Sequence, residues 1–163
     1  MKTINYTYPC TRTVNAKGFG LYLEQNLGEP RKNIRLFAKE FGEIIGRPIK
    51  KCPTNFVMVN SGSSANLVAA MAMAEKCRRC NKPLTAVASA FTFPTTMSAL
   101  ILAGFQVTLV DVEEEGFNMD IDQLENLEEK PSVVAVTHFL GFPADMIKLK
   151  QYAEKTACFI LQD

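Results

Sequence analysis

The protein has 163 residues, of which 47% are hydrophobic and 21% are charged, and its formal net charge at pH 7 is +1. A chain of this length and composition is typical of a soluble globular domain with a sizeable core. The near-neutral charge gives no reason to expect a nucleic acid or an anionic membrane surface as a partner.

Targeting and membrane signals are not expected in this sequence. Residues 1–10 contain no apolar run of the kind found in signal peptides, and no stretch is long and apolar enough to span a bilayer. The five cysteines are an odd number without a secretory signal, which favours a reducing compartment. We therefore expect a cytoplasmic protein with no membrane partner.

The first part of the chain, residues 1–46, is expected to form an N-terminal arm followed by one helix. Apolar residues recur at helical spacing from Arg31 to Ile45, and Gly46 follows them as a stop signal. Residues 47–55 contain two prolines and predict a connector. Residues 47–163, which include this connector, are expected to form an α/β unit.

The stretch after the connector carries the strongest local pattern. Four apolar residues, Phe56–Val59, predict a short buried strand. The five small residues Asn60–Ser64 suit a tight turn and a helix N-cap. Residues Ala65–Ala74 are small or apolar almost all round, which predicts a helix buried on more than one side.

This strand–turn–helix pattern has two interpretations. Unpaired backbone N–H groups at the start of a helix, together with its dipole, favour an anion such as phosphate. Gly62 would let the backbone approach a ligand closely, and the hydroxyls of Ser61, Ser63 and Ser64 would add donors. The same residues also suit an ordinary capped helix, so the local pattern alone leaves both interpretations open.

Downstream, strands and helices are expected to alternate, with a polar loop at residues 77–83 and an acidic loop at residues 113–118. The expected strands are residues 84–89, 105–112, 132–137 and 157–161, and the expected helices are residues 94–103, 120–129 and 144–155. This alternation predicts repeated βαβ units and hence a largely parallel sheet with helices on both faces.

In such a sheet, ligands bind beyond the carboxyl ends of the strands. Four turns are therefore expected on one rim: residues 60–64, 90–93, 138–142 and 162–163. The single histidine, His138, lies on this rim, although a lone histidine more often has a structural role than a catalytic one. Cys77 and Cys80 form one CxxC motif without a second pair at matching spacing, so we expect no metal site.

Five segments, in this order and spacing, resemble the DegT/StrS family. They are NSGSSANL, AFTFPTTMSALILAG, VDVEEEGFNMDIDQLE, THFLGFPADM and FILQD. Enzymes of this family have the fold-type I architecture, depend on pyridoxal phosphate and act on nucleotide-linked keto sugars. The resemblance covers nearly the whole chain and implies part of the fold-type I large domain. The segment SGSSANL followed by FPTT is particularly similar to the branch of CDP-hexulose 3-dehydratases, which uses pyridoxamine phosphate.

The resemblance implies a role for six residues in cofactor binding. The turn formed by Gly62, Ser63, Ser64 and Ala65 would hold the cofactor phosphate. Phe93 would stack on the pyridine ring, and Asp163 would pair with the protonated ring nitrogen. A carboxylate keeps that nitrogen protonated, and the ring withdraws electrons best in this form. Judged without the resemblance, Phe93 would be a core residue and Asp163 a strand-boundary residue.

The resemblance assigns no catalytic residue to this sequence. The family's Schiff-base lysine, or the histidine that replaces it in the dehydratase branch, corresponds to a position beyond Asp163. We therefore expect the N-terminal portion of a longer enzyme, a truncated form that is inactive alone.

For the intact enzyme the resemblance implies an aminotransferase that uses pyridoxal phosphate, an amino donor and a nucleotide-linked 4-keto-6-deoxy sugar in polysaccharide biosynthesis. The alternatives are a pyridoxamine-phosphate-dependent nucleotide-sugar 3-dehydratase and a catalytically inactive remnant. The resemblance also implies a homodimer.

Overall fold

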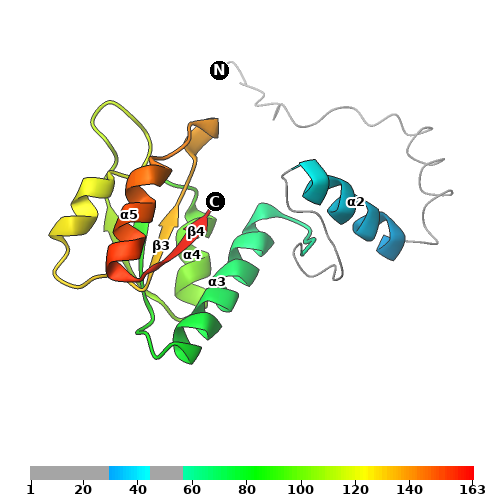
Figure 1. Ribbon diagram of the computed structural model, residues 1–163, viewed down its shortest axis with the longest axis horizontal. Helices are drawn as coiled ribbons and strands as arrows, with labels where there is room; N and C mark the ends of the chain where they lie inside the picture. The colour runs from blue at the N-terminus through cyan, green and yellow to red at the C-terminus, as the bar shows by residue number, and fades with distance from the viewer. Residues whose placement is uncertain (1–29, 45–56) are drawn as a thin grey trace, which may run out of the picture. The chain divides into compact units, whose positions relative to one another are not determined.

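The computed structural model describes residues 30–44 and 57–163 of the chain (Figure 1). The chain divides into two compact units, Met1–Met58 and Val59–Asp163. None of the described helices has both the length and the hydropathy that are needed to cross a bilayer.

The first unit contributes one described helix, α2 (Pro30–Ile44). Proline at the first helical position suits α2, because its fixed φ matches the helix and its missing N–H would have no helical partner there. The rings of Phe37 and Phe41, four residues apart, are stacked at 5.6 Å. The helix predicted from Arg31 to Ile45 is thus confirmed, while Ile45, Gly46 and the connector lie outside the described residues.

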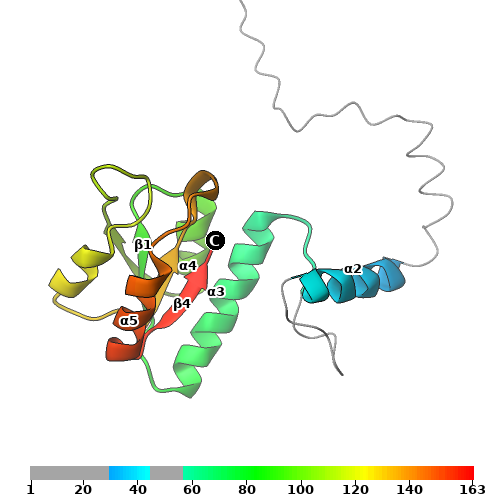
Figure 2. The same ribbon diagram turned by 45° about the horizontal axis from the view of Figure 1, so that its top comes forward.

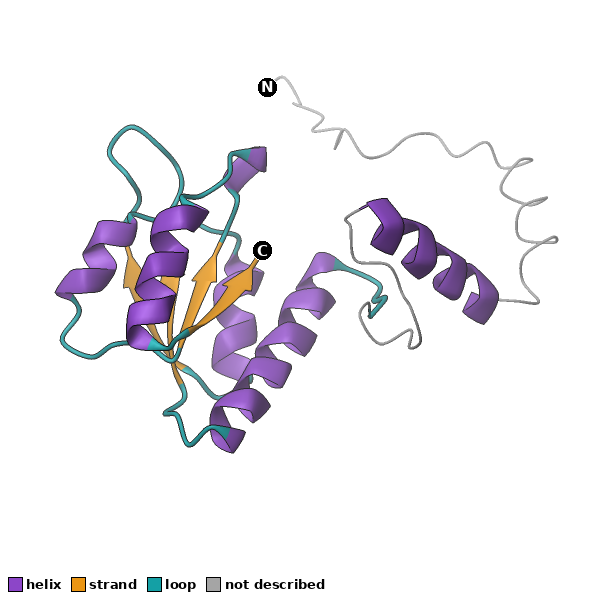
Figure 3. Ribbon diagram, viewed as in Figure 1, coloured by secondary structure: helices purple, strands orange, loops and turns teal. Residues whose placement is uncertain are grey.

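The second unit is built on a four-stranded sheet in which every pair of neighbouring strands is parallel (Figure 3). Its strands are β1 (Thr85–Ser89), β2 (Gln106–Val110), β3 (Val133–Val136) and β4 (Phe159–Gln162), in the spatial order β2-β1-β3-β4. The predicted parallel sheet is confirmed, because each of the four predicted downstream strands is present with its ends no more than two residues from the expected ones.

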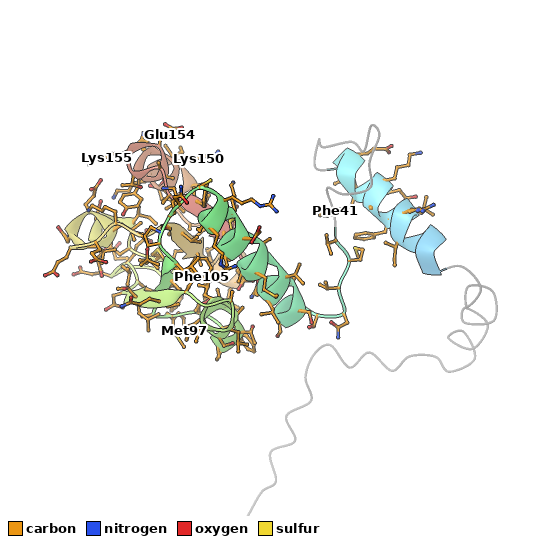
Figure 4. All side chains as sticks on the ribbon, turned by 90° about the horizontal axis from the view of Figure 1, so that it is seen from below. Phe41, Met97, Phe105, Lys150, Glu154 and Lys155 are labelled. Atoms are coloured by element: carbon orange, nitrogen blue, oxygen red, sulfur yellow. The ribbon has the colours of Figure 1, made fainter. Side chains whose placement is uncertain are left out.

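Helices cover both faces of this sheet. One face packs against α3 (Gly62–Arg79) and α4 (Pro94–Leu102), and α3 runs beside both α4 and β4 (Figure 2). The other face packs against the 3₁₀ helix η2 (Ile121–Asn126) and α5 (Met146–Thr156). Figure 4 accordingly shows Met97 of α4 on one side of the unit and Lys150, Glu154 and Lys155 of α5 on the opposite side.

The two faces follow from the alternation of side chains along each strand. In β1, Ala86 and Ala88 face the α3–α4 side, whereas Val87 faces the α5 side. In β3, Val133 and Ala135 belong to the first face, and Val134 and Val136 belong to the second. All of these residues are at most 1% exposed, so they form the two halves of one buried core.

The predicted strand Phe56–Val59 is wrong for the part that is described. Val57–Val59 has no regular secondary structure, and Val57 is 69% exposed, while Phe56 lies outside the described residues. An isolated apolar segment gains little from an extended conformation unless a neighbouring strand pairs with it. The strands described in the second unit pair only with one another.

Helix α3 differs from its prediction in length and in burial. It continues into the expected loop as far as Arg79. Lys76, Arg78 and Arg79 suit the negative end of the helix dipole, and Arg79 pairs with Glu75 at 2.8 Å. Its fully buried residues form a single stripe, which consists of Ala70, Ala74 and Cys77. The prediction that this helix is buried on more than one side is therefore wrong within this unit.

The helix predicted at residues 120–129 is a shorter 3₁₀ helix, η2. Asp120 caps it by accepting a hydrogen bond from the backbone N–H of Asp122, but Leu127 is already extended. Helix α5 begins after Asp145, whose carboxylate accepts hydrogen bonds from the N–H groups of Ile147 and Lys148, two residues later than expected. Helix α4 begins at Pro94 as predicted, and Gly104 follows its end with a φ of +95°.

Candidate functional site at the carboxyl rim of the sheet

The strand order creates a topological switch point between β1 and β3. From β1 the chain crosses to β2 on one side, whereas from β3 it crosses to β4 on the other side. In open α/β sheets a crevice forms at this point, outside the carboxyl ends of the strands. The turn after β1 and the turn after β3 border this crevice, so the predicted rim is where a ligand site is expected.

Asp163 joins three elements at this rim. It directly follows β4, and its backbone is fixed to β3, since its N–H donates to the carbonyl of Val136 and its carbonyl accepts from the N–H of His138. Its Oδ2 accepts hydrogen bonds from the side-chain amide of Asn66 on α3, at 2.9 Å, and from the hydroxyl of Thr96 on α4. Its Oδ1 has no hydrogen-bond partner among the described residues.

The N-terminus of α3 is capped by its own serines. Ser61 is the N-cap, and its Oγ accepts from the N–H of Ser64 at 3.1 Å. The Ser64 hydroxyl donates to the side chain of Asn60 at 2.7 Å. In the described part of the chain, the N–H groups of Gly62 and Ser63 and the hydroxyl of Ser63 have no partner. These three donors are therefore available to an anion.

There is room for a ligand beside these donors. A Cβ added to Gly62 would meet no atom of the structure within 4 Å, so packing within the described residues does not explain the glycine. A pocket of about 280 Å³ lies between the N-terminal part of α3 and the length of α4. It is lined by Ser63, Ser64, Leu67, Thr95, Ser98, Ala99 and Leu102.

Phe93 lies in the turn that leads into α4. It occupies the N-cap position in an extended conformation and is 66% exposed, so in this unit it is not a core residue. An exposed ring on the same rim as Asp163 is available to stack on a planar ligand. The structure thus places Phe93, Asp163 and the start of α3 on one side of the sheet, where α3 and α4 pack.

The pattern of the DegT/DnrJ/EryC1/StrS aminotransferase family matches residues 22–163. The chain belongs to the DegT/DnrJ/EryC1/StrS aminotransferase family.

Two curated relatives are similar to almost the whole chain. GDP-4-keto-6-deoxy-D-mannose 3-dehydratase of Yersinia pseudotuberculosis is 28% identical over 144 residues, which cover 86% of this chain and 35% of that protein. Lipopolysaccharide biosynthesis protein RfbH of Salmonella typhimurium is 30% identical over 162 residues, which cover 95% of this chain and 36% of that protein. The chain therefore spans about a third of the length of the curated relatives it matches.

A solved structure shows the same fold. The Escherichia coli GDP-4-keto-6-deoxy-D-mannose-3-dehydratase with bound hydrated PLP matches with a TM-score of 0.72 at 22% identity. The match covers 94% of this chain and 39% of that protein. The described sheet and its helices are accordingly part of a fold-type I large domain.

Within this DegT/StrS chain, His138 holds the turn after β3 in place. Its Nδ1 accepts from the N–H of Ala144 at 3.1 Å, so in the neutral ring the proton lies on Nε2, which faces the side-chain oxygen of Gln162 at 3.1 Å. Both ring nitrogens are thus used in protein contacts. The geometry favours the structural role over the catalytic one.

The remaining candidates of the DegT/StrS chain do not assemble into a second site. Cys77 is fully buried in α3, where burial raises the pKa of its thiol, whereas Cys80 is exposed at the helix end. Among residues 30–44 and 57–163, no cluster of His, Cys, Asp and Glu side chains is suited to hold a metal ion. The rings of Phe91, Phe117 and Phe139 pack together at the rim, with centroids 4.6–5.8 Å apart.

Sequence reasoning missed the polar residues that surround Asp163. Asn66, Thr92, Thr96 and Thr137 were not among the predicted site residues, yet they link the ends of β1, β3 and β4. The available signal was the FTFPTT segment, which places hydroxyls directly after a buried strand. Only the tertiary fold shows that two of these hydroxyls meet partners 45 and 67 positions away.

Proposed function

We propose that this chain supplies the cofactor-binding part of a pyridoxal-phosphate-dependent enzyme that transfers an amino group to a nucleotide-linked 4-keto-6-deoxy sugar. The observation that carries the proposal is the Asp163 carboxylate, held on Oδ2 by two donors while Oδ1 remains without a partner, on the rim where α3 begins. When bound, pyridoxal phosphate acts as an electron sink for the carbon that loses or gains a proton.

The donors in the site fit a phosphorylated pyridine. Asn66 is four residues after Gly62, which corresponds to roughly 6 Å along a helix axis. The free N–H groups of Gly62 and Ser63 therefore lie about one helical turn before the residue whose amide binds the Asp163 carboxylate. The helix start supplies donors and a positive dipole end for the phosphate, and Asp163 supplies a negative charge for a protonated ring nitrogen.

Each proposed residue has a limited task. Gly62, Ser63, Ser64 and Ala65 provide the backbone turn for the phosphate, and Phe93 covers one face of the ring. Asp163 holds a proton on the ring nitrogen, which strengthens electron withdrawal. These tasks bind and orient the cofactor. They do not by themselves choose the reaction.

A second candidate function is the nucleotide-sugar 3-dehydratase that uses pyridoxamine phosphate. It is favoured by the name of one curated relative, GDP-4-keto-6-deoxy-D-mannose 3-dehydratase. The same rim residues would serve either reaction, since both cofactor forms carry the phosphate and the pyridine nitrogen.

We further propose that the protein works in the cytoplasm as a homodimer, with a nucleotide sugar and an amino donor as its small-molecule partners. Support for a partner chain comes from apolar residues on the second unit that remain exposed: Val68, Met71, Ile101, Leu102 and Leu109. Light scattering should give a mass of at least two chains, and a monomer at high concentration would contradict the homodimer.

Cofactor binding is tested by titrating the chain with pyridoxal phosphate and with pyridoxamine phosphate in a calorimeter. Gly62→Val should abolish most of the binding, because its side chain would occupy the space beside the free N–H groups. It should leave the unfolding midpoint nearly unchanged, because a Cβ there meets nothing within 4 Å. Ser63→Ala should weaken binding more than Ser64→Ala, since the Ser64 hydroxyl is already bonded to Asn60.

Thr108→Val is the matched control, since Thr108 is exposed on β2, away from the rim. Equal affinity of the parent and Gly62→Val for pyridoxal phosphate would overturn the phosphate assignment.

A further inference from the structure

A row of hydroxyl groups connects the switch point to Asp163. Thr137 follows β3, Thr92 follows β1, and their Oγ1 atoms are 2.7 Å apart. Thr92 is in turn 3.3 Å from the hydroxyl of Thr96 in the first turn of α4, and Thr96 contacts Oδ2 of Asp163. The row therefore runs across the ends of three strands and finishes on one carboxylate oxygen.

The direction of these hydrogen bonds is determined by the carboxylate. An ionised carboxylate only accepts, so the single hydroxyl proton of Thr96 points to Asp163. Thr96 then accepts from Thr92, and because the proton of Thr92 is used there, Thr137 must donate in the 2.7 Å contact. All the dipoles are aligned toward Asp163, and such chains polarise one another cooperatively.

The second donor acts on the same oxygen. The amide of Asn66 reaches Oδ2 from α3, while Thr96 reaches it from α4, so the carboxylate is held from two helices. Thr96 is only 2% exposed, which limits competition from water for its hydroxyl. With Oδ2 accepting two hydrogen bonds, Oδ1 is the oxygen left for a ligand.

We propose that Thr96 and Asn66 are positioning residues that hold Asp163 with Oδ1 toward the ring nitrogen of the cofactor, and that Thr92 and Thr137 support Thr96 in this task. The inference rests on the proposed function, since it assumes that a pyridine ring occupies the site. It adds that recognition of the ring nitrogen, as distinct from the phosphate, depends on the amide and the hydroxyl row.

The test compares two ligands on the full chain. One is pyridoxal phosphate, and the other is its analogue in which the ring nitrogen is replaced by C–H. The parent should prefer pyridoxal phosphate, because only the nitrogen can carry a proton to Asp163. The quantity to measure by fluorescence titration is the ratio of the two dissociation constants, which a general loss of structure does not alter.

Thr96→Val should lower this preference roughly tenfold, the size expected for one hydrogen bond to a charged group, with little change in affinity for the analogue. Thr96→Ser keeps the hydroxyl and should restore the preference. Asn66→Leu should lower it by a similar or smaller factor. Thr108→Val, on the exposed surface of β2, should leave it unchanged.

A merely structural role predicts a different pattern. If Thr96→Val weakened both ligands equally, or if the parent bound both equally well, the positioning role would be wrong while phosphate binding could stand. If the parent bound neither ligand, the proposed function would fail. The positioning role would then be decided by side-chain couplings of Asp163 measured by NMR in the ligand-free chain.

Those couplings should report one rotamer of Asp163 in the parent and rotamer averaging in Thr96→Val. Averaging in the parent itself would overturn the inference.

Discussion

The two faces of the sheet are built from side chains of different size and carry different groups at their ends. The face toward α3 and α4 is rich in alanine: Ala70, Ala74, Ala86, Ala88, Ala99 and Ala135. The face toward η2 and α5 contains larger residues: Val87, Val110, Met119, Leu124, Val134, Val136, Leu149 and Tyr152. Among the described residues, the side chains of Asn66 and Thr96 converge on Asp163 at the end of the alanine-rich face.

This difference indicates how the candidate site is assembled. Small side chains allow α3 and α4 to approach the strands closely, and a short amide and a short hydroxyl can then reach one carboxylate. The larger side chains of the other face bury more apolar area per residue and contribute more to stability. We therefore expect substitutions on the alanine-rich face to weaken ligand binding. Substitutions on the face toward η2 and α5 should mainly lower the stability of the fold.

The largest effect is expected from Leu149→Ala on the α5 face. Leu149 is fully buried, so its truncation should lower the free energy of unfolding by about 2–5 kcal/mol through lost burial and a cavity. Urea unfolding measures this loss. Protein that remains folded should bind pyridoxal phosphate as the parent does. A large loss of affinity in the folded fraction would contradict the proposal that the α5 face affects stability and not ligand binding.

The next effect is expected from Ala88→Leu on the alanine-rich face. Ala88 is fully buried, and the added atoms should cost about 1–3 kcal/mol by overpacking. Because α3 or α4 must move outward, the contacts of Asn66 and Thr96 with Asp163 should lengthen and cofactor affinity should fall. Thr108→Leu adds similar bulk on the exposed surface of β2 and serves as the control. Unchanged affinity in Ala88→Leu would show that close helix approach is unnecessary.

The two helix caps provide a matched pair across the faces. Asp145 caps α5 and Ser61 caps α3, and replacement of either residue by alanine should lower stability by about 1 kcal/mol. Only Ser61→Ala should also weaken cofactor binding, because it disturbs the turn before Gly62 and Ser63. Thermal unfolding and ligand titration of the two variants measure the two effects, and equal affinities would contradict the assignment of the site to α3.

The smallest effect concerns Tyr152, whose buried hydroxyl has no hydrogen-bond partner among the described residues. Tyr152→Phe removes this unpaired group, so stability at pH 7 should be unchanged or higher by up to about 1 kcal/mol. A decrease of more than this would indicate an unrecognised partner of the hydroxyl.

Tyr152 also predicts a pH dependence. Burial raises the pKa of Tyr152 from its usual value of 10.0 to about 12. Between these values the unfolded chain loses the proton and the folded chain keeps it, so the stability of the parent should decrease as the pH rises through this window. Denaturant unfolding of the parent and of Tyr152→Phe should show this contribution in the parent alone.

Most of the fold was predictable because its signals are local. Strands β1, β3 and β4 each contain a short apolar run, Ala86–Ala88, Val133–Val136 and Phe159–Leu161. Pro94, Gly104 and Asp145 mark helix ends through their own backbone or side-chain chemistry. Val57–Val59 was misjudged because an apolar run forms a strand only when another strand pairs with it. The length of α3 was underestimated because its last turn is stabilised by charges that resemble those of a polar loop.

The candidate site was predictable only in outline. The rim follows from parallel topology, and the resemblance to the family indicated Gly62, Ser63, Ser64, Ala65, Phe93 and Asp163, whose roles stay predictions. The contacts of Asp163 depend on how far α3 and α4 lie from β4, and no local pattern encodes that distance. Asn66 in particular looks like an ordinary polar residue of a helix until the fold brings it to a carboxylate 97 positions away.

The backbone pairing of Asp163 with the end of β3 has a consequence for insertions and deletions. Its N–H and carbonyl engage Val136 and His138, which continues the register that aligns Val136 with Gln162. A slip of one residue would replace the carboxylate by the amide of Gln162 and turn the neighbouring side chains to the opposite face. A length change between α5 and β4 is thus tolerable only if the turn at Ala157 and Cys158 absorbs it completely.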